Sequence, residues 1–267
     1  MKTGPQKYPG ASTTYWWQSR YGGTAMESNV GVIHTTEGWS VPDYGRGASA
    51  PNFTALPDIK AKRLVWHQHF DFDVSSRALV NRAGGVETNQ LNAVQVELVG
   101  TCDERHAESW SGRKAGVGYL FWPEAPDWAL AELGRFVRWA HDHHGIRMQS
   151  SVTWKAYKKG QVGGSYGANS VRLTGAQWLN YYGWLGHQHV PENSHGDPGD
   201  IDFARVLEHA KGAPGGTSYA VRKGDTLWSI AASKLGDGAR WREIATLNKL
   251  RDADEITPGQ KLKLPKK

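Results

Sequence analysis

The first 210 positions contain short runs in which β-branched apolar residues dominate or alternate with polar ones. The runs 30–35 and 93–99 predict strands, and 64–70 predicts a weaker strand. Successive side chains of a strand point to opposite faces of its sheet. The residues of 93–99 therefore divide into two sets, Val94, Val96 and Leu98 against Gln95, Glu97 and Val99.

Helical spacing of apolar residues appears between these strand candidates and after them. From 127 to 144 apolar residues recur every three or four positions, and Gly145 then supplies a helix stop. Further helices are predicted at 75–83, which ends at two glycines, at 174–182, which opens with a capping box, and at 202–211. Strands interleaved with helices predict an α/β class with a central mixed β-sheet flanked by helices.

A change of pattern near position 211 predicts a domain boundary. Residues 211–218 read Lys-Gly-Ala-Pro-Gly-Gly-Thr-Ser, the composition of a short flexible linker. The tail then predicts a strand, two helices and a strand, at 218–222, 225–234, 240–248 and 260–264. We therefore expect a large domain at 1–210, with its core at about 28–210, a linker at 211–218 and a β-α-α-β domain at 219–267.

Composition narrows the class of protein. Of 267 residues 39% are hydrophobic and 22% charged, which excludes a disordered or collagen-like chain. The single cysteine, Cys102, permits no intramolecular disulfide and is expected to be a buried small residue. The first ten residues are polar and no apolar run could span a membrane, so we expect synthesis in a bacterial cytoplasm without a signal peptide.

The positive charge is concentrated in the tail. Residues 219–267 carry 11 basic and 6 acidic side chains, whereas 1–210 carry 20 of each. The tail has no cysteine pairs and no RNA-recognition signature, so we expect no nucleic-acid partner. An anionic polymer such as bacterial cell wall is the simpler expectation, and the 13 tryptophans could serve flat ligands such as sugars.

Two histidine-containing segments are candidates for metal chemistry. His34 ends the first predicted strand, and the loop 186–199 holds three histidines and Asp197. Imidazole and carboxylate are the ligands of catalytic zinc, which commonly takes three protein groups and leaves one position for water. Taken alone, the residues also allow a structural histidine and a solvated polar loop.

Together these segments resemble the zinc-dependent N-acetylmuramoyl-L-alanine amidases of the phage-lysozyme and peptidoglycan-recognition family. The resemblance rests on Val-Ile-His-Thr-Thr-Glu-Gly at 32–38, Gly-His at 186–187 and Asp-Pro-Gly at 197–199, and it extends through 84–89 and 93–100. It implies an amidase fold over most of 28–210. It also implies a zinc ion (Zn²⁺) held by His34, His187 and Asp197.

The same resemblance implies roles for two further residues. Glu97 would be the general base that takes a proton from zinc-bound water, although an alternating strand also allows a plain surface glutamate. His195, where relatives often carry lysine or threonine, would stabilise the oxyanion or compete as a metal ligand. His189 ranks third for the metal. His141, His143 and His144 lie at a helix C-terminus, where a structural role is expected.

Substrate contacts are expected from residues in or beside the loops that should border the cleft. These are Trp39, Tyr44, Asn52, Trp66, His69 and Asn89. Each of them could instead serve packing or turn formation.

The tail resembles a LysM domain along its full length. The resemblance rests on Tyr-Ala-Val-Arg-Lys-Gly-Asp-Thr-Leu-Trp-Ser-Ile-Ala at 219–231, on Asn248 and on Ile-Thr-Pro-Gly-Gln-Lys-Leu at 256–262. It implies binding of N-acetylglucosamine-containing glycans between the loops near 224–227 and 254–257. The implied contact residues are Gly224, Asp225, Thr226, Leu227 and Ile256, while Trp228 and Ile230 are expected to fill the small core.

Both parts of the chain imply the same substrate, bacterial peptidoglycan. The protein resembles a monomeric phage endolysin that cleaves the amide between N-acetylmuramic acid and L-alanine and reaches the wall through a holin. Three alternatives stay open at this point. They are a catalytically inactive peptidoglycan-recognition protein, a zinc peptidase that cuts the stem peptide, and a host autolysin.

Overall fold

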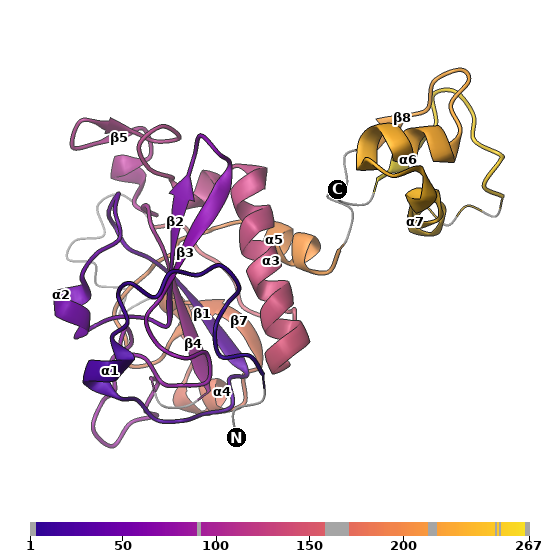
Figure 1. Cartoon of the computed structure of the whole chain (residues 1–267). Coiled ribbons are helices and arrows are strands. Elements are labelled where there is room, and N and C mark those ends of the chain that lie inside the picture. The colour runs from indigo at the N-terminus through magenta and orange to yellow at the C-terminus, as the bar shows by residue number, and fades with distance from the viewer. Residues whose placement is uncertain are drawn as a thin grey trace. The chain divides into compact units, whose positions relative to one another are not determined.

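A computed structural model describes residues 4–89, 92–157, 171–212, 218–248, 250 and 252–264. The chain divides into two compact units, Met1–Lys211 and Gly212–Lys267, each with its own elements (Figure 1). Positions 213–217 of the expected linker lie outside the described residues.

The first unit is built on a five-stranded mixed sheet with the order β3-β2-β4-β1-β7. Its strands are β1 (Val30–Thr35), β2 (Phe53–Asp58), β3 (Arg63–Gln68), β4 (Ala93–Leu98) and β7 (Gly183–Gly186). β1 runs parallel to both β4 and β7, and β2 runs parallel to β4. β3 joins antiparallel at the edge. The predicted class, a central mixed sheet flanked by helices, is confirmed.

Two helices, α3 (Asp127–His144) and α5 (Phe203–Ala210), cover one face of the sheet (Figure 1). The main core lies between them and the strands, and it includes Ile33, Phe53, Val94, Val96, Leu98, Trp184, Leu133, Phe136 and Val206. None of the described helices combines the length and the apolar character needed to cross a bilayer.

The opposite face carries a smaller apolar cluster. Val30 and Val32 of β1 pack there with Leu185 and with Trp178 of α4 (Gly175–Leu179). The remaining elements of this unit are short: α1 (Gln18–Tyr21), α2 (Tyr44–Gly47), β5 (Ser109–Trp110), β6 (Arg113–Lys114) and the 3-10 turns Glu104–His106, Trp122–Glu124 and His187–His189. Helices and loops thus cover both faces of the sheet.

Local sequence signals account for several of these elements. α3 has the predicted bounds and ends at Gly145, whose φ of +74° is the left-handed conformation that glycine adopts without strain. α5 begins where the Asp202 side chain accepts a hydrogen bond from the Arg205 amide. The capping box of Thr174 and Gln177 opens α4, but that helix ends at Leu179, earlier than predicted.

The predicted helix at 75–83 is wrong. Its backbone is irregular because amide side chains from distant positions accept the N–H groups that a helix would use. Gln95 accepts from Ala78, and Asn89 accepts from Leu79. Asn193 accepts from Val80, a residue 113 positions away. These long-range bonds outweigh the local helical pattern.

The sequence pattern did not predict two of the strands, β2 and β7. β2 contains Pro57 and Asp58, and β7 is the tetrapeptide Gly-Trp-Leu-Gly, so both are poor in strand-forming residues. Burial on both faces makes them strands nonetheless. In β7 the side chain of Trp184 fills the space that Gly31 of β1 leaves open, since a Cβ at Gly31 would lie 2.3 Å from the indole ring.

The second unit is the β-α-α-β domain that the tail pattern predicts. Its elements are β8 (Ser218–Ala220), α6 (Leu227–Leu235), the 3-10 turn Gly238–Arg240, α7 (Trp241–Leu247) and β9 (Lys261–Lys263), with β8 and β9 antiparallel. Ile230 is buried in its core as expected. The prediction for Trp228 is wrong, because its side chain is 60% exposed and lies over Gly238.

Candidate metal centre

The candidate centre lies at the carboxyl ends of the parallel strands. His34 is the fifth residue of β1, Glu97 is its register partner on β4, and His187 directly follows β7. Partners in parallel strands point to the same face, so His34 and Glu97 share the face opposite α3. Val94, Val96 and Leu98 face the main core, as the alternation predicts.

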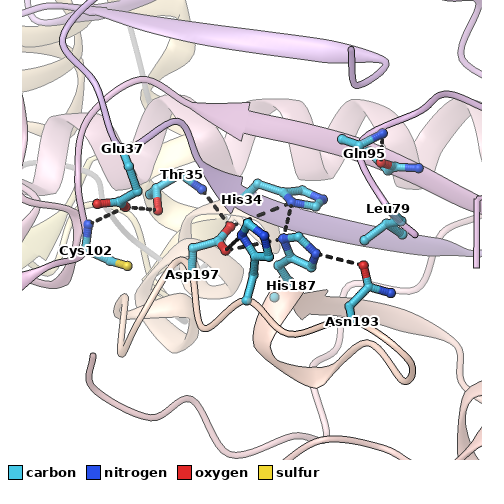
Figure 2. Close-up of polar contacts among 12 residues, drawn as sticks. His34, Thr35, Glu37, Leu79, Gln95, Cys102, His187, Asn193 and Asp197 are labelled. Atoms are coloured by element: carbon cyan, nitrogen blue, oxygen red, sulfur yellow. Dashed lines mark hydrogen bonds and ion pairs between the residues drawn. The ribbon is translucent and has the colours of Figure 1, made fainter. Parts of the chain in front are cut away.

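The structure brings the three predicted ligands together (Figure 2). His34 Nδ1 lies 3.0 Å from His187 Nδ1 and 3.7 Å from Asp197 Oδ2, and His187 Nδ1 lies 3.3 Å from Asp197 Oδ1. Ligand atoms 2.0–2.1 Å from a tetrahedral zinc ion would lie about 3.3 Å apart. The buried donor set of two imidazoles and one carboxylate therefore fits zinc in both chemistry and spacing.

The electrostatics of the cluster favour the metal-binding protonation states of His34 and Asp197. Burial, followed by the nearby His187, lowers the pKa of His34 well below its usual value and keeps the imidazole neutral. Burial alone would raise the pKa of Asp197, but its interactions with His187 and His195 outweigh that effect and hold the pKa well below the ordinary range. Neutral imidazole and ionised carboxylate are the forms that bind a metal.

Backbone and side-chain contacts fix the two ligands that come from the loop. The Thr35 amide donates to Asp197 Oδ2 at 3.1 Å, and the Gln188 amide donates to the Asp197 carbonyl oxygen at 3.0 Å. On the far side of the His187 ring, Nε2 lies 3.1 Å from Asn193 Oδ1 (Figure 2). The loop is therefore anchored on β1 and within itself before any metal binds.

Glu97 is half-buried and lines a pocket of about 510 Å³ together with His187, His195 and Asp197. Burial of its carboxyl group, followed by repulsion from Asp197 and Glu37, raises the pKa of Glu97 well above its usual value. Its Oε2 is buried and has no hydrogen-bond partner among the described residues. A titratable group with a raised pKa in a pocket beside metal ligands is typical of a catalytic site.

His195 also belongs to the centre, whereas His189 does not. His195 stacks on the His187 ring at 4.6 Å, and its Nδ1 lies 3.6 Å from Asp197 Oδ1. This contact with Asp197 raises the pKa of His195, while its side chain stays 67% exposed. His189 is fully buried and its ring is held by Gly186 and by the Thr153 carbonyl, so its role is structural.

Two residues near the centre have no signal of their own in the sequence. The Glu37 carboxylate accepts hydrogen bonds from Thr35 Oγ1, Thr101 Oγ1 and the Cys102 amide, and so ties the segment after β1 to the segment after β4. Asn193 is the other, because a lone asparagine in a polar loop is indistinguishable from a turn former. Cys102 itself is buried, as expected.

The residues predicted to contact substrate differ in their burial and in the pocket that they line. Asn52 and His69 have no exposed surface in this conformation and are bonded to interior groups. Trp66 is buried in the main core. Tyr44 lines the pocket of the centre, and Asn89 lines a second pocket. Trp39 is half-buried and packs edge-on against Trp110, outside both linings.

The expected glycan-binding loop of the second unit is organised around Asp225. Its carboxylate accepts from the Tyr219 hydroxyl and from the Arg222 amide, and Gly224 before it has a φ of +89°. Thr226 caps α6, and Leu227 is buried in the domain core. Ile256 packs against the same core. Side-chain contact from Leu227 is therefore excluded in this conformation, while backbone contact is not.

Comparison with known proteins identifies one module. Residues 219–265 match the LysM domain family, which indicates peptidoglycan binding. The chain is 42% identical over 67 residues to the uncharacterized protein YqbP of Bacillus subtilis, an alignment that covers 21% of this chain and 30% of the relative. It is 38% identical over 73 residues to an uncharacterized protein of Deinococcus radiodurans, covering 25% of this chain and 29% of that protein.

These alignments span less than a third of the length of either relative. No solved structure matches the chain. The comparisons therefore identify the family of the second unit alone.

Proposed function

We propose that the first unit is a zinc-dependent N-acetylmuramoyl-L-alanine amidase and that the LysM domain holds it on peptidoglycan. The observation that carries the proposal is the buried cluster of His34, His187 and Asp197 beside an open pocket. The family match of the second unit to a peptidoglycan-binding module supplies the substrate class.

The chain's own residues would divide the work of amide hydrolysis. Zinc, when bound by the three ligands, would polarise the amide carbonyl and lower the pKa of water to about 7. Glu97, the register partner of His34 on the neighbouring strand, would take a proton and pass it to the leaving amine. His195, exposed beside the ligands, is placed to donate a hydrogen bond to the oxyanion.

The environment of Glu97 suits such a proton-transfer role. In the metal-free protein, burial and repulsion from Asp197 favour the protonated carboxyl group. A cation bound beside Asp197 would offset this repulsion and favour the ionised carboxylate. A carboxyl group acts as a base when ionised and as an acid once it has taken up the proton.

The biological role that fits this activity is that of a phage endolysin. In this role the protein is made in the cytoplasm of a bacterial host and reaches the wall after a holin opens the membrane. The excess of basic residues in 219–267 supports attachment to an anionic wall.

The test is mass spectrometry of purified peptidoglycan after digestion by the full chain with zinc. Free stem peptides that begin with L-alanine, together with peptide-free glycan strands, are expected. Glu97→Gln should abolish the products, whereas Glu108→Gln, at an exposed position outside the pocket, should leave them unchanged. Unchanged peptidoglycan from several chemotypes would instead favour a recognition protein. Cleavage within the stem peptide would favour a zinc peptidase.

A further inference from the structure

Asn193 is buried in the loop that carries the metal ligands, and its amide group makes four polar contacts. Its Oδ1 lies 2.9 Å from the Val80 amide nitrogen and 3.1 Å from His187 Nε2. Its Nδ2 lies 2.9 Å from the Pro191 carbonyl oxygen and 3.5 Å from Thr88 Oγ1. Every polar atom of the side chain is therefore engaged.

The orientation of this amide follows from the chemistry of its partners. The backbone N–H of Val80 can only donate, so the atom that faces it must be the oxygen. The carbonyl of Pro191 can only accept, so the atom that faces it must be the nitrogen. Two independent backbone groups thus fix which end of the Asn193 amide is directed at His187.

This orientation determines the proton on His187. Amide oxygen accepts and never donates, so His187 Nε2 must carry the hydrogen. The neutral ring then has its lone pair on Nδ1, the atom that lies 3.0 Å from His34 Nδ1 and 3.3 Å from Asp197 Oδ1. In Figure 2 the His187 ring faces His34 and Asp197, the other two candidate ligands, on this side.

We infer that Asn193 is a positioning residue for the metal centre, which holds His187 in the Nε2–H tautomer and offers Nδ1 to the metal. Groups of this kind behind a ligand commonly contribute 10–100-fold to metal affinity. The same oxygen also accepts from Val80, so Asn193 couples this tautomer to the irregular segment 75–83. In its metal aspect the inference rests on the proposed function.

Zinc affinity, measured by competition with a chromophoric chelator, is the first test. Asn193→Ala should weaken zinc binding roughly 10–100-fold. Asn89→Ala is the matched control, because Asn89 accepts from the neighbouring Leu79 amide but does not contact His187. It should reduce resistance to urea to a similar extent and leave zinc affinity within about threefold of the wild type, a difference of only about 0.7 kcal/mol.

Asn193→Asp separates positioning from folding. Aspartate keeps an acceptor for Val80 and His187 but loses the donor to Pro191, so the fold should weaken while zinc affinity is retained. If zinc affinity falls in parallel with urea resistance in all three variants, Asn193 is merely structural and the inference is overturned.

Nitrogen-15 NMR of the histidine rings tests the tautomer directly in the metal-free protein. The wild type should show His187 protonated at Nε2 and bare at Nδ1, and Asn193→Ala should lose this preference. A wild-type His187 protonated at Nδ1 alone would overturn the inference. Because this measurement needs neither zinc nor substrate, it distinguishes failure of the inference from failure of the proposed amidase.

Discussion

The pair formed by His144 and Asp73 offers a demanding test of the physical account of this fold. Both side chains are fully buried at the end of α3, with His144 Nδ1 at 2.9 Å from Asp73 Oδ2 and Nε2 at 3.1 Å from the Pro5 carbonyl oxygen. Both neighbours of the ring are oxygen acceptors, so the imidazole bridges Asp73 and the Pro5 backbone. The Phe72 ring stacks on the imidazole at 3.8 Å.

His144→Phe would keep the aromatic stack and remove both ring nitrogens. It would leave the Asp73 carboxylate buried with Gln6 and the Ser28 amide as its remaining donors. Breaking a buried charged pair by removing one partner costs about 3–5 kcal/mol. For a unit of this size that loss corresponds to a fall of roughly 6–20 °C in melting temperature.

The pKa of Asp73 determines how the stabilisation by the His144–Asp73 contact changes with pH. Burial acts to raise the pKa of Asp73, but hydrogen bonds from His144 and Gln6 outweigh it and keep the pKa below its ordinary value of 3.8. A lowered pKa in the folded state means that the stabilisation is complete above about pH 4 and is lost as the pH falls further. The difference in the free energy of unfolding between wild type and variant should therefore become smaller as the pH falls below about 4.

Calorimetry of the full chain would measure the effect. The control is His143→Phe, an exposed neighbour on the same helix end, which should change stability by less than about 0.5 kcal/mol. Adding Asp73→Asn to His144→Phe should recover about 1–3 kcal/mol relative to the sum of the single losses. A loss below about 1 kcal/mol for His144→Phe would refute the reasoning, because a paired buried charge must cost more to orphan.

Three further predictions concern the site, the sheet and the wall-binding unit. In metal-free protein at pH 7, Glu97→Gln should raise stability by about 1–2 kcal/mol, because it removes a half-buried carboxyl group whose ionisation the fold disfavours. That gain should vanish in urea titrations below about pH 4, where Glu97 is protonated in both states; an equal gain at both pH values would contradict the burial argument. Gly31→Ala should lower the melting temperature of the first unit, because its Cβ would meet the Trp184 ring and overpacking costs about 1–3 kcal/mol. Binding of the full chain to purified peptidoglycan should weaken when salt rises from about 0.1 M to about 1 M, which shortens the screening length from about 10 Å to about 3 Å; sedimentation with the wall would show no change if charge plays no part.

The sequence alone determined the helices and strands that depend on residues close together in the chain. The bounds of α3 follow from apolar spacing and Gly145, and the inward set of β4 follows from simple alternation. The tail pattern likewise defined the second unit, which the LysM family match then named. In each case the deciding interactions lie within a few positions of one another.

The candidate site could be predicted only in part from the sequence, and the tertiary structure determined the rest. The resemblance to zinc amidases predicted His34, His187 and Asp197 as ligands from the sequence. The fold then brings their ligand atoms to distances that suit zinc. The burial of Asn52 and His69 could not be predicted, because it depends on which distant segments pack over a residue.

Only the tertiary structure decided how distant groups pair. The segment 75–83 has helical spacing, yet its N–H groups bond to Gln95, Asn89 and Asn193, which lie 17, 10 and 113 positions away. The same fold brings Asn193 behind His187 and buries Glu97 beside Asp197. Hydrogen bonds and pKa shifts of this kind depend on the distance between groups in space. The periodic spacing of apolar residues reflects only their separation along the chain.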